Sequence, residues 1–534
     1  MLTTMSWGAI FRMVEATAQA APSLLCGLLL AGVFRQLLGS ANTRRLFGSN
    51  TWRSLPQAWA VGMLLPLCSL GTIPIIRELR RFGISGSVIL AFALAAPLLN
   101  PVSLLYGLTL SSPRLILSFV FGSLIVISIL GIAWGRILPA KPELEPVTPP
   151  IAPGLKRWVA VLVTASRHCA DATMIYCGIG ILGMGVIAAL LPRGCLASSL
   201  NHSNPWAPLV MATVAPLIYV TPTNVMMQLG SMFNHGNSVG AAFALLTIGA
   251  GVNAGLIAWT WKTFGFRATL AWFLTLELVV VGLGYAVEKP LYLDGQAEAN
   301  HTHVFDSFTS PFSSDNPGLP SHAITMLAEK VTIDQRIAMA MLLILGITGV
   351  ALRRLDPGQR VERWLCKEHP QVSSSGFAGN ILNRPLSGPV LGACALLIVV
   401  ALSIVACYIV YPDAHEVFED MQIVRADALC AVNCGDKKQA ERQLHIWDDL
   451  ARKLEVGTYL RQWHLTPAQQ EASRNLRQLL MQLDDALDVK GTEKSKALVA
   501  SVNRAYEDCR RAFLAKDVVP RELTQHTGDL TRDR

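Results

Sequence analysis

The stretch ISGSVILAFALAAPLLNPVSLLYGLTL, residues 84–110, decides how this chain folds. It is apolar and long enough to cross a bilayer, which takes about 20 residues of helix. Pro97, Asn100 and Pro101 interrupt it near the middle, and each proline removes a backbone hydrogen bond. An unpaired backbone group in hydrocarbon costs several kcal/mol. We therefore expect a broken helix whose freed groups meet protein, water or a solute.

A second stretch repeats the first. GNSVGAAFALLTIGAGVNAGLIAWTW, residues 236–261, has Gly249 and Gly251 in place of the prolines, and after a two-residue slip Asn253 matches Asn100. A shift of 151 positions aligns identical residues in both halves, including Trp7 with Trp158, Cys26 with Cys177, Gly27 with Gly178, Gly32 with Gly183, Thr72 with Thr223, Phe82 with Phe233 and Phe92 with Phe243. Paired interrupted segments in two halves indicate a transporter binding site.

The composition is that of a membrane protein. The 534 residues are 52% hydrophobic and 15% charged, whereas soluble proteins carry roughly 25% charge. The net charge of +8 comes from the part before Pro412, which fits cytoplasmic loops that obey the positive-inside rule. Because no block of Lys and Arg is interleaved with aromatic residues, a nucleic-acid partner is not expected.

The predicted fold is an all-α polytopic membrane protein with two tandem four-segment repeats, two further transmembrane helices and a C-terminal soluble four-helix bundle. Ten apolar segments are expected at 20–38, 55–76, 85–110, 114–137, 171–191, 207–229, 238–261, 268–287, 335–352 and 386–411. The expected domains are repeat 1 at 1–138, a Pro-rich linker at 139–157, repeat 2 at 158–287, a polar extracytoplasmic loop at 288–334, two extra transmembrane helices at 335–411, the bundle at 412–519 and a disordered tail at 520–534.

The loop charges predict the orientation. Residues 38–52 and 353–384 are basic and should be cytoplasmic, while 288–334 is rich in acids and should lie outside, which also places the C-terminal bundle outside. The arginines of 77–81 then fall on the wrong side, which favours re-entrant neighbouring segments. If all four segments of each half span, the repeats are parallel, and one re-entrant segment reverses that conclusion.

The matched asparagines are the leading site candidates. Asn100 and Asn253 can bind a solute, or they can satisfy only the broken backbone around them. The predicted substrate-binding set adds the residues that flank the interrupted stretches, namely Pro97, Pro101, Gly249, Gly251, Thr72, Thr223 and Cys68.

Two further groups carry separate hypotheses. Glu277 lies inside an apolar segment, where a carboxylate should be protonated, paired or turned to a wet cavity, so it is a candidate for proton coupling. The alternative is a neutral acid bonded to a neighbouring helix. His301, His303 and Asp306 have a spacing compatible with a divalent metal, although solvated histidines in a loop are common. No other cofactor is expected.

The residues from Cys68, CSLGTIPIIRELRRFGISGSVILAFALAAPLLNPVSLL, resemble the signature of predicted permeases of the YraQ/ArsP type. The resemblance covers about residues 5–290 and implies an inner-membrane permease; members of the ArsP branch are regarded as exporters of trivalent organoarsenicals. Two positions depart from the family pattern. Leu70 replaces the second cysteine of the turn, and 219–222 lacks the usual cysteine in the second half.

The predicted function is a multi-pass permease of the bacterial inner membrane, in contact with lipid, that moves a small solute by alternating access, with efflux of a metalloid as one option. The alternative is a membrane-anchored scaffold whose bundle binds an extracytoplasmic protein. An enzyme is not expected, because no HExxH motif occurs and Glu277 alone is not a catalytic set.

Overall fold

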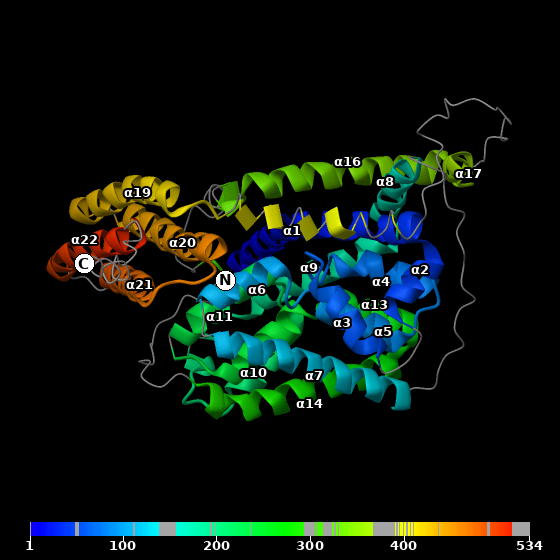
Figure 1. Ribbon diagram of the computed structural model, residues 1–534, viewed down its shortest axis with the longest axis horizontal. Helices are drawn as coiled ribbons and strands as arrows, with labels where there is room; N and C mark the ends of the chain where they lie inside the picture. Colours follow the sequence, from blue (N-terminus) through cyan, green and yellow to red (C-terminus); the bar gives the residue numbers. More distant parts are fainter. Residues whose placement is uncertain are drawn as a thin grey trace, which may run out of the picture. The chain divides into compact units, whose positions relative to one another are not determined.

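The computed structural model describes residues 2–514 with gaps. The positions outside it are 1, 49–52, 111–112, 138–155, 193–194, 197, 235, 293–304, 306, 313–322, 325–326, 329, 367–389, 391–393, 395, 399, 402–403, 406, 409–410, 436, 489–491 and 515–534. The chain divides into two compact units, Met1–Val405 and Ala406–Arg534. Across the described residues the secondary structure is helical without strands, apart from one isolated bridge between Asn201 and Asn237 (Figure 1).

The first unit is built from long apolar helices and short broken ones (Figure 1). Its elements are α1 (Leu2–Val33), η1 (Phe34–Leu38), α2 (Gly39–Phe47), α3 (Ser54–Met63), α4 (Thr72–Arg81), α5 (Gly86–Ala95), α6 (Pro101–Leu110), α7 (Pro113–Ile137), α8 (Lys156–Cys169), α9 (Ala172–Leu190), η2 (Ser198–Leu200), α10 (Ala207–Val214), η3 (Ala215–Leu217), α11 (Pro222–Asn234), α12 (Val239–Ala244), η4 (Leu245–Ala250), α13 (Ala254–Phe264), α14 (Phe266–Leu291), α16 (Ile333–Leu355) and α17 (Arg360–Cys366).

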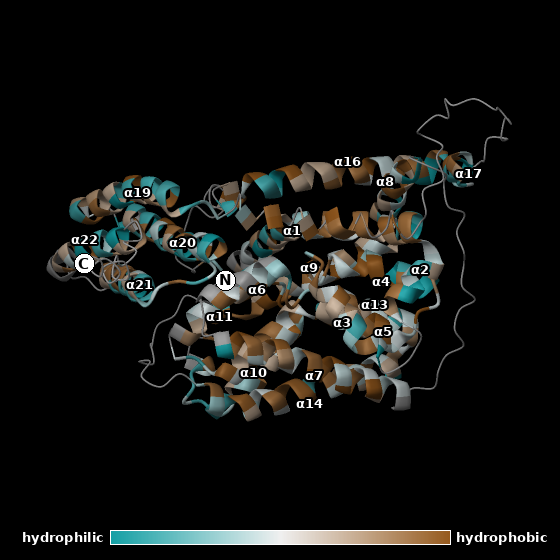
Figure 2. Ribbon diagram, in the orientation of Figure 1, coloured by the Kyte–Doolittle hydropathy of each residue, from teal (hydrophilic) through white to brown (hydrophobic). Residues whose placement is uncertain are grey.

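Several of these helices are suited to a bilayer. Among the described residues, five continuous helical stretches are long and apolar enough to cross it, at Met5–Phe47, Arg114–Gly135, Ala172–Leu190, Phe266–Leu291 and Ile333–Leu355, and a bent pair makes a sixth if it counts as one span. Figure 2 shows α7, α14 and α16 largely in the brown of hydrophobic residues, whereas α2 is teal. The chain is an all-helical multi-pass membrane protein.

The first helix packs antiparallel to α9 and also contacts α8. A Cβ on Gly185, near the end of α9, would lie 2.8 Å from Met13 near the start of α1. A Cβ on Gly32, at the end of α1, would lie 2.7 Å from the Val161 carbonyl of α8. The sequence did not predict α8 as a separate helix; Asp171 ends it and caps α9 by accepting the Thr173 N–H. The helix α1 of the first half and the helix α9 of the second half therefore run in opposite directions.

Two expected segments, 55–76 and 207–229, are each split into short helices with a non-helical turn between them. In the first, α4 returns to the side from which α3 started, because Arg44 Nε of α2 donates to the Phe82 carbonyl at 2.7 Å. The arginines of 77–81 therefore lie beside the basic end of α2. This geometry removes the charge conflict that a fully spanning segment would create.

The two interrupted stretches are broken as the sequence predicts. Between α5 and α6, residues 96–100 leave the helix, and Pro101 occupies the first position of α6, where its missing N–H has no partner to lose. In the second stretch η4 and α13 are bent by 59° around Gly251. A Cβ on Gly251 would lie 2.7 Å from Leu94 of α5, so the two breaks pack against each other.

The described part of the second unit includes the helices α19 (Ala414–Cys434), α20 (Lys437–Gln462), α21 (Pro467–Asp488) and α22 (Thr492–Leu514). Its core is centred on Trp447 and Tyr506, both fully buried. Asp413 accepts the Glu416 N–H at the start of α19, and Thr466 and Gln469 cap α21 reciprocally. The expected transmembrane segment that precedes this unit, 386–411, lies largely outside the described residues.

Candidate functional site

The turn between α3 and α4 lies at the centre of the first unit. Cys68, Ser69, Leu70 and Thr72 are all fully buried. The backbone is held locally, since the Gly71 N–H donates to Cys68 Sγ at 3.3 Å and Thr72 Oγ1 donates to the Ser69 carbonyl at 2.9 Å. The Ser69 hydroxyl has no hydrogen-bond partner. The predicted Thr72 therefore uses its hydroxyl to stabilise the turn. The hydroxyl without a partner belongs to Ser69, which the sequence analysis missed.

The turn between η3 and α11 faces the first one. Its Tyr219 is 2% exposed, and the phenol oxygen makes no hydrogen bond although the Cys68 thiol and the Ser23 hydroxyl are among its polar neighbours. The shift of 151 positions pairs Cys68 with Tyr219, and this signal could have found the residue. The predicted Thr223 is half-buried one position inside α11.

Glycines bring these turns into contact with the long helices. A Cβ on Gly27 of α1 would lie 2.0 Å from the Gly71 carbonyl oxygen, and one on Gly255 of α13 would lie 2.0 Å from the Tyr176 carbonyl oxygen. Because a carbon atom cannot approach an oxygen so closely, only glycine allows these backbones to pack. The site is thus built on close helix contacts of the kind that small residues permit in membranes.

Asn100 and Asn253 both cap the helix that follows the break. Asn100 Oδ1 accepts the Ser103 N–H at 2.7 Å, and Asn253 Oδ1 accepts the Leu256 N–H at 2.9 Å. The oxygens therefore satisfy the broken backbone. The Asn253 amide nitrogen is buried without any hydrogen-bond partner.

The residues around the breaks differ in what they contribute. Pro97 is buried, while Pro101 is partly exposed. Gly249 lies against Ala215 of η3, and Gly251 separates the two breaks. The Thr247 hydroxyl, one turn earlier, is a further buried polar group without a partner.

Two more thiols lie near Cys68. Cys26 of α1 and Cys177 of α9, which the repeat pairs with each other, both lie close to it. Cys177 also points at the Leu70 carbonyl, 3.9 Å from its Sγ. The helices thus supply thiols although Leu70 occupies the place of the turn's second cysteine. The described residues contain no cluster of His, Cys, Asp and Glu with the geometry of a metal site.

The remaining predicted residues lie apart from this centre or outside the described residues. Glu277 is half-buried on α14, and its Oε1 is buried without a hydrogen-bond partner. His301, His303 and Asp306 lie outside the described residues.

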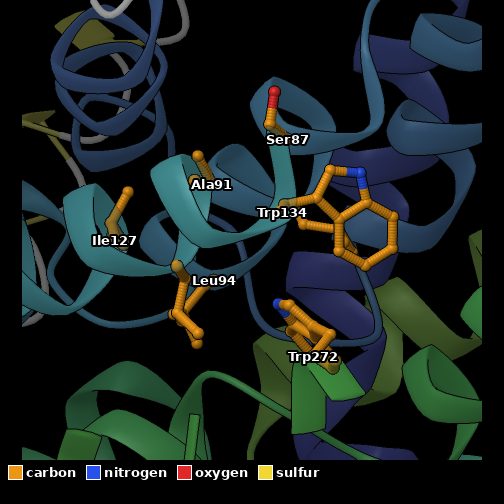
Figure 3. A pocket seen from close by; sticks show the side chains of 9 residues that line it. Ser87, Ala91, Leu94, Ile127, Trp134 and Trp272 are labelled. Atoms are coloured by element: carbon orange, nitrogen blue, oxygen red, sulfur yellow. The ribbon is translucent and has the colours of Figure 1, made fainter. Parts of the chain in front are cut away.

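An apolar pocket lies beside the first broken helix. Figure 3 shows Trp134 and Trp272 facing it from α7 and α14, with Leu94 of α5 on its wall. The remaining lining is Ser87, Leu90, Ala91, Ile127, Leu130 and Gly131, so Ser87 supplies its one polar side chain. Leu94 also contacts Gly251, and the pocket therefore adjoins the breaks without entering the polar centre.

Comparison with known proteins identifies related sequences. The family model ArsP_1, described as predicted permease, matches residues 7–289. UPF0718 protein YcgR of Bacillus subtilis (strain 168) is 30% identical over 91 residues, which are 17% of this chain and 31% of that relative. No solved structure matches the chain.

Proposed function

The chain belongs to the ArsP_1 family of predicted permeases, and from that premise we propose that the centre of its first unit is the site through which a small solute crosses the membrane. The observation that carries the proposal is a group of buried polar atoms without partners, at the tips of the broken segments: Ser69 Oγ, Tyr219 Oη, Thr247 Oγ1 and Asn253 Nδ2. Buried polar atoms are nearly always paired. Two of these atoms, Ser69 Oγ and Tyr219 Oη, lie on the facing turns, and two lie at the second break; a transient ligand accounts for such a set.

The proposed transport cycle uses inverted repeats. The antiparallel packing of α1 on α9 supports a pseudo-two-fold axis in the membrane plane, and so do the split segments 55–76 and 207–229. The parallel arrangement would require all eight segments to span. The last helix of each half also begins at a matching position. The start of α14 at Phe266 follows the start of α7 at Pro113 by the same number of residues that separates Asn253 from Asn100. Rocking of the repeats about the facing turns would open the centre to each side alternately.

The charge distribution supports an orientation. Arg35, Arg44 and Arg81 gather at one end of the first unit, where Arg353 donates to the Ala170 carbonyl at 2.6 Å. By the positive-inside rule this end faces the cytoplasm. The second unit follows one further predicted crossing, so we place it outside the cytoplasm, where its surface is free to bind a protein partner.

The chemistry of the centre favours an uncharged, thiophilic solute. Its side chains are thiols, hydroxyls and an amide, namely Cys26, Cys68, Cys177, Ser69, Tyr219 and Asn253, and none of them carries a formal charge at neutral pH. A trivalent organoarsenical or a similar neutral metalloid fits this set, and export is the expected direction.

Asn253→Ser tests the site without removing the helix cap. Serine is as good an N-cap as asparagine, but it lacks the amide donor that is unpaired here. We expect normal thermal unfolding of the purified protein, with uptake of trivalent methylarsenite into proteoliposomes reduced about tenfold, the effect of losing one hydrogen bond of about 1.4 kcal/mol. Arsenite and benzoate complete the panel. Full uptake by the variant, or no uptake of any panel member by the wild type, would contradict the proposal.

Removing the second unit separates the permease from the scaffold alternative. Because the chain divides at Val405 into two compact units, a protein truncated after Tyr411 should retain the first unit's packing. A permease is then expected to keep methylarsenite transport within about threefold of the full chain, a change of less than 1 kcal/mol. The measurement is uptake per reconstituted protein. A scaffold predicts instead that the truncated protein has no activity of its own.

A further inference from the structure

A buried hydrogen-bonded pair of side chains links the two halves near the basic end. Glu78 of α4 and His168 of α8 are 1% and 2% exposed, and His168 Nε2 lies 2.9 Å from Glu78 Oε1. Arg81 Nη1 lies 2.5 Å from the same oxygen, and Arg35 of η1 lies 3.8 Å from it. A buried carboxylate of this kind persists only because opposite charges and hydrogen bonds replace its water.

The imidazole continues the connection toward α9. His168 Nδ1 lies 3.2 Å from Thr173 Oγ1 and 3.7 Å from Asp171 Oδ2. Arg77 of α4 donates to the Thr173 hydroxyl and pairs with Asp171 at 2.5 Å. In the tautomer with a proton on Nε2, His168 donates to Glu78 and accepts from Thr173. One chain of hydrogen bonds therefore holds α4 against the joint between α8 and α9.

Charge balance favours the ionised form of Glu78 in this arrangement. Burial raises its pKa, but the hydrogen bond from His168 and the charges of Arg81 and Arg35 outweigh burial and hold the pKa below its usual range. Burial likewise raises the pKa of Asp171, and hydrogen bonds from Arg77 and Thr173 hold it low. The α5 helix packed against α4 has no ionisable residue. On α1, Arg12 and Glu15 pair with each other at 2.5 Å.

The network is present in one half only. The shift of 151 positions places Leu229 opposite Glu78, Gln228 opposite Arg77 and Thr17 opposite His168. The repeat packs without these charges in its second copy, so the fold does not require them. Glu78 also lies on the helix that starts at the buried centre; it is six residues, or about 9 Å, beyond Thr72. Glu78 and His168 therefore lie between the buried Cys68–Thr72 turn and the basic end of the first unit.

We propose that the Glu78–His168 pair is the proton-binding site that couples a proton gradient to transport, an assignment that rests on the proposed function. When α4 moves away from the joint between α8 and α9, Arg81 and His168 no longer stabilise the ionised carboxylate. A proton from the aqueous phase then binds Glu78 Oε1, and the carboxylate becomes a neutral acid. In this protonated state α4 is released from the joint, and the first turn is free to move with its repeat.

Proton binding is tested without any solute. Infrared difference spectra of the full-length protein on acidification should show the carbonyl band of a protonated carboxylic acid that Glu78→Gln removes. Glu15→Gln is the matched control, because Glu15 is also a buried, paired carboxylate, and the band should persist there. A band that survives in Glu78→Gln overturns the proposal even if methylarsenite is not a substrate.

Coupling is tested in proteoliposomes with methylarsenite as probe. In Glu78→Gln, accumulation driven by a pH gradient should fall to the level reached without a gradient, while exchange of preloaded probe continues. A merely structural role would reduce both together and would overturn the assignment. Loss of accumulation in Glu277→Gln but not in Glu78→Gln would move the coupling site to α14 and also overturn it.

His168→Gln keeps the proposal falsifiable if Glu78→Gln does not fold. Glutamine retains an N–H that can donate to Glu78 but lacks the ring Nδ1 that lies 3.2 Å from Thr173 Oγ1. Because the partner that stabilises the carboxylate changes, the pH at which the Glu78 band appears should move by about one unit, a tenfold change in proton affinity. An unchanged midpoint would show that His168 and Glu78 are not one proton site.

Discussion

Gly27→Ala is expected to prevent the first unit from folding, or to cost about 3 kcal/mol or more of its stability, the upper end for overpacked cores. A Cβ at this position would lie 2.0 Å from the Gly71 carbonyl oxygen and 2.8 Å from the Gly71 Cα. Both atoms belong to the backbone of the Cys68–Thr72 turn, so no side chain can rotate away. The turn, with the thiol and hydroxyls it carries, would have to move off α1.

The repeat supplies a matched control for this prediction. Gly178 is the counterpart of Gly27 in α9, and a Cβ there meets nothing within 4 Å. Gly178→Ala should be neutral, or stabilising by up to about 1 kcal/mol, because alanine favours a helix more than glycine does. Thermal unfolding and the yield of monodisperse protein measure both variants. Equal stability of the two would contradict the close approach of α1 to the turn.

Tyr219→Phe is expected to reduce transport about tenfold while leaving stability unchanged or higher. The phenol oxygen is buried and has no hydrogen-bond partner of normal geometry, although the Cys68 thiol and the Ser23 hydroxyl lie close to it. Its removal therefore costs little within the protein and relieves the desolvation of a polar group. If the hydroxyl meets the solute in the occluded state, its loss removes about 1.4 kcal/mol of binding. Methylarsenite uptake and thermal unfolding are measured on the same preparation.

A control for the hydroxyl is available at Tyr285. Its phenol donates to the Pro205 carbonyl at 2.7 Å and the residue is 44% exposed, at the far end of α14 from the break. Tyr285→Phe should leave uptake unchanged. Full uptake by Tyr219→Phe together with a loss of stability would mean that the hydroxyl serves packing, and the site would then have to be placed elsewhere.

The sequence predicts the breaks because their causes are local. Pro97 and Pro101 cannot continue a helix, and Asn100 and Asn253 each cap the helix that follows. The same holds for α7, α14 and α16, whose apolar runs correspond to the long helices observed. The identity of the family also follows from sequence, because the signature around Cys68 is contiguous.

The packing of the two turns against each other depends on contacts between residues that are far apart in the sequence. The sequence singled out Cys68 and Thr72 on one turn and Thr223 on the other, yet the unpaired groups belong to Ser69 and Tyr219. Whether a buried hydroxyl finds a partner depends on which helix packs against it. Gly27 and Gly255 determine this packing. Because they have no side chain, α1 can approach the backbone at Gly71 and α13 can approach the backbone at Tyr176.

What the sequence alone determined is where the helices stop, since prolines, caps and apolar runs act within a few residues. Only the tertiary structure decided which residues meet. The hydrogen bond from Arg44 to the Phe82 carbonyl brings the end of α4 back beside α2. Glu78 contacts His168, which is 90 residues away in the chain. A charge is tolerated in such a core only where a distant partner lies within hydrogen-bond reach, and no local pattern specifies that partner.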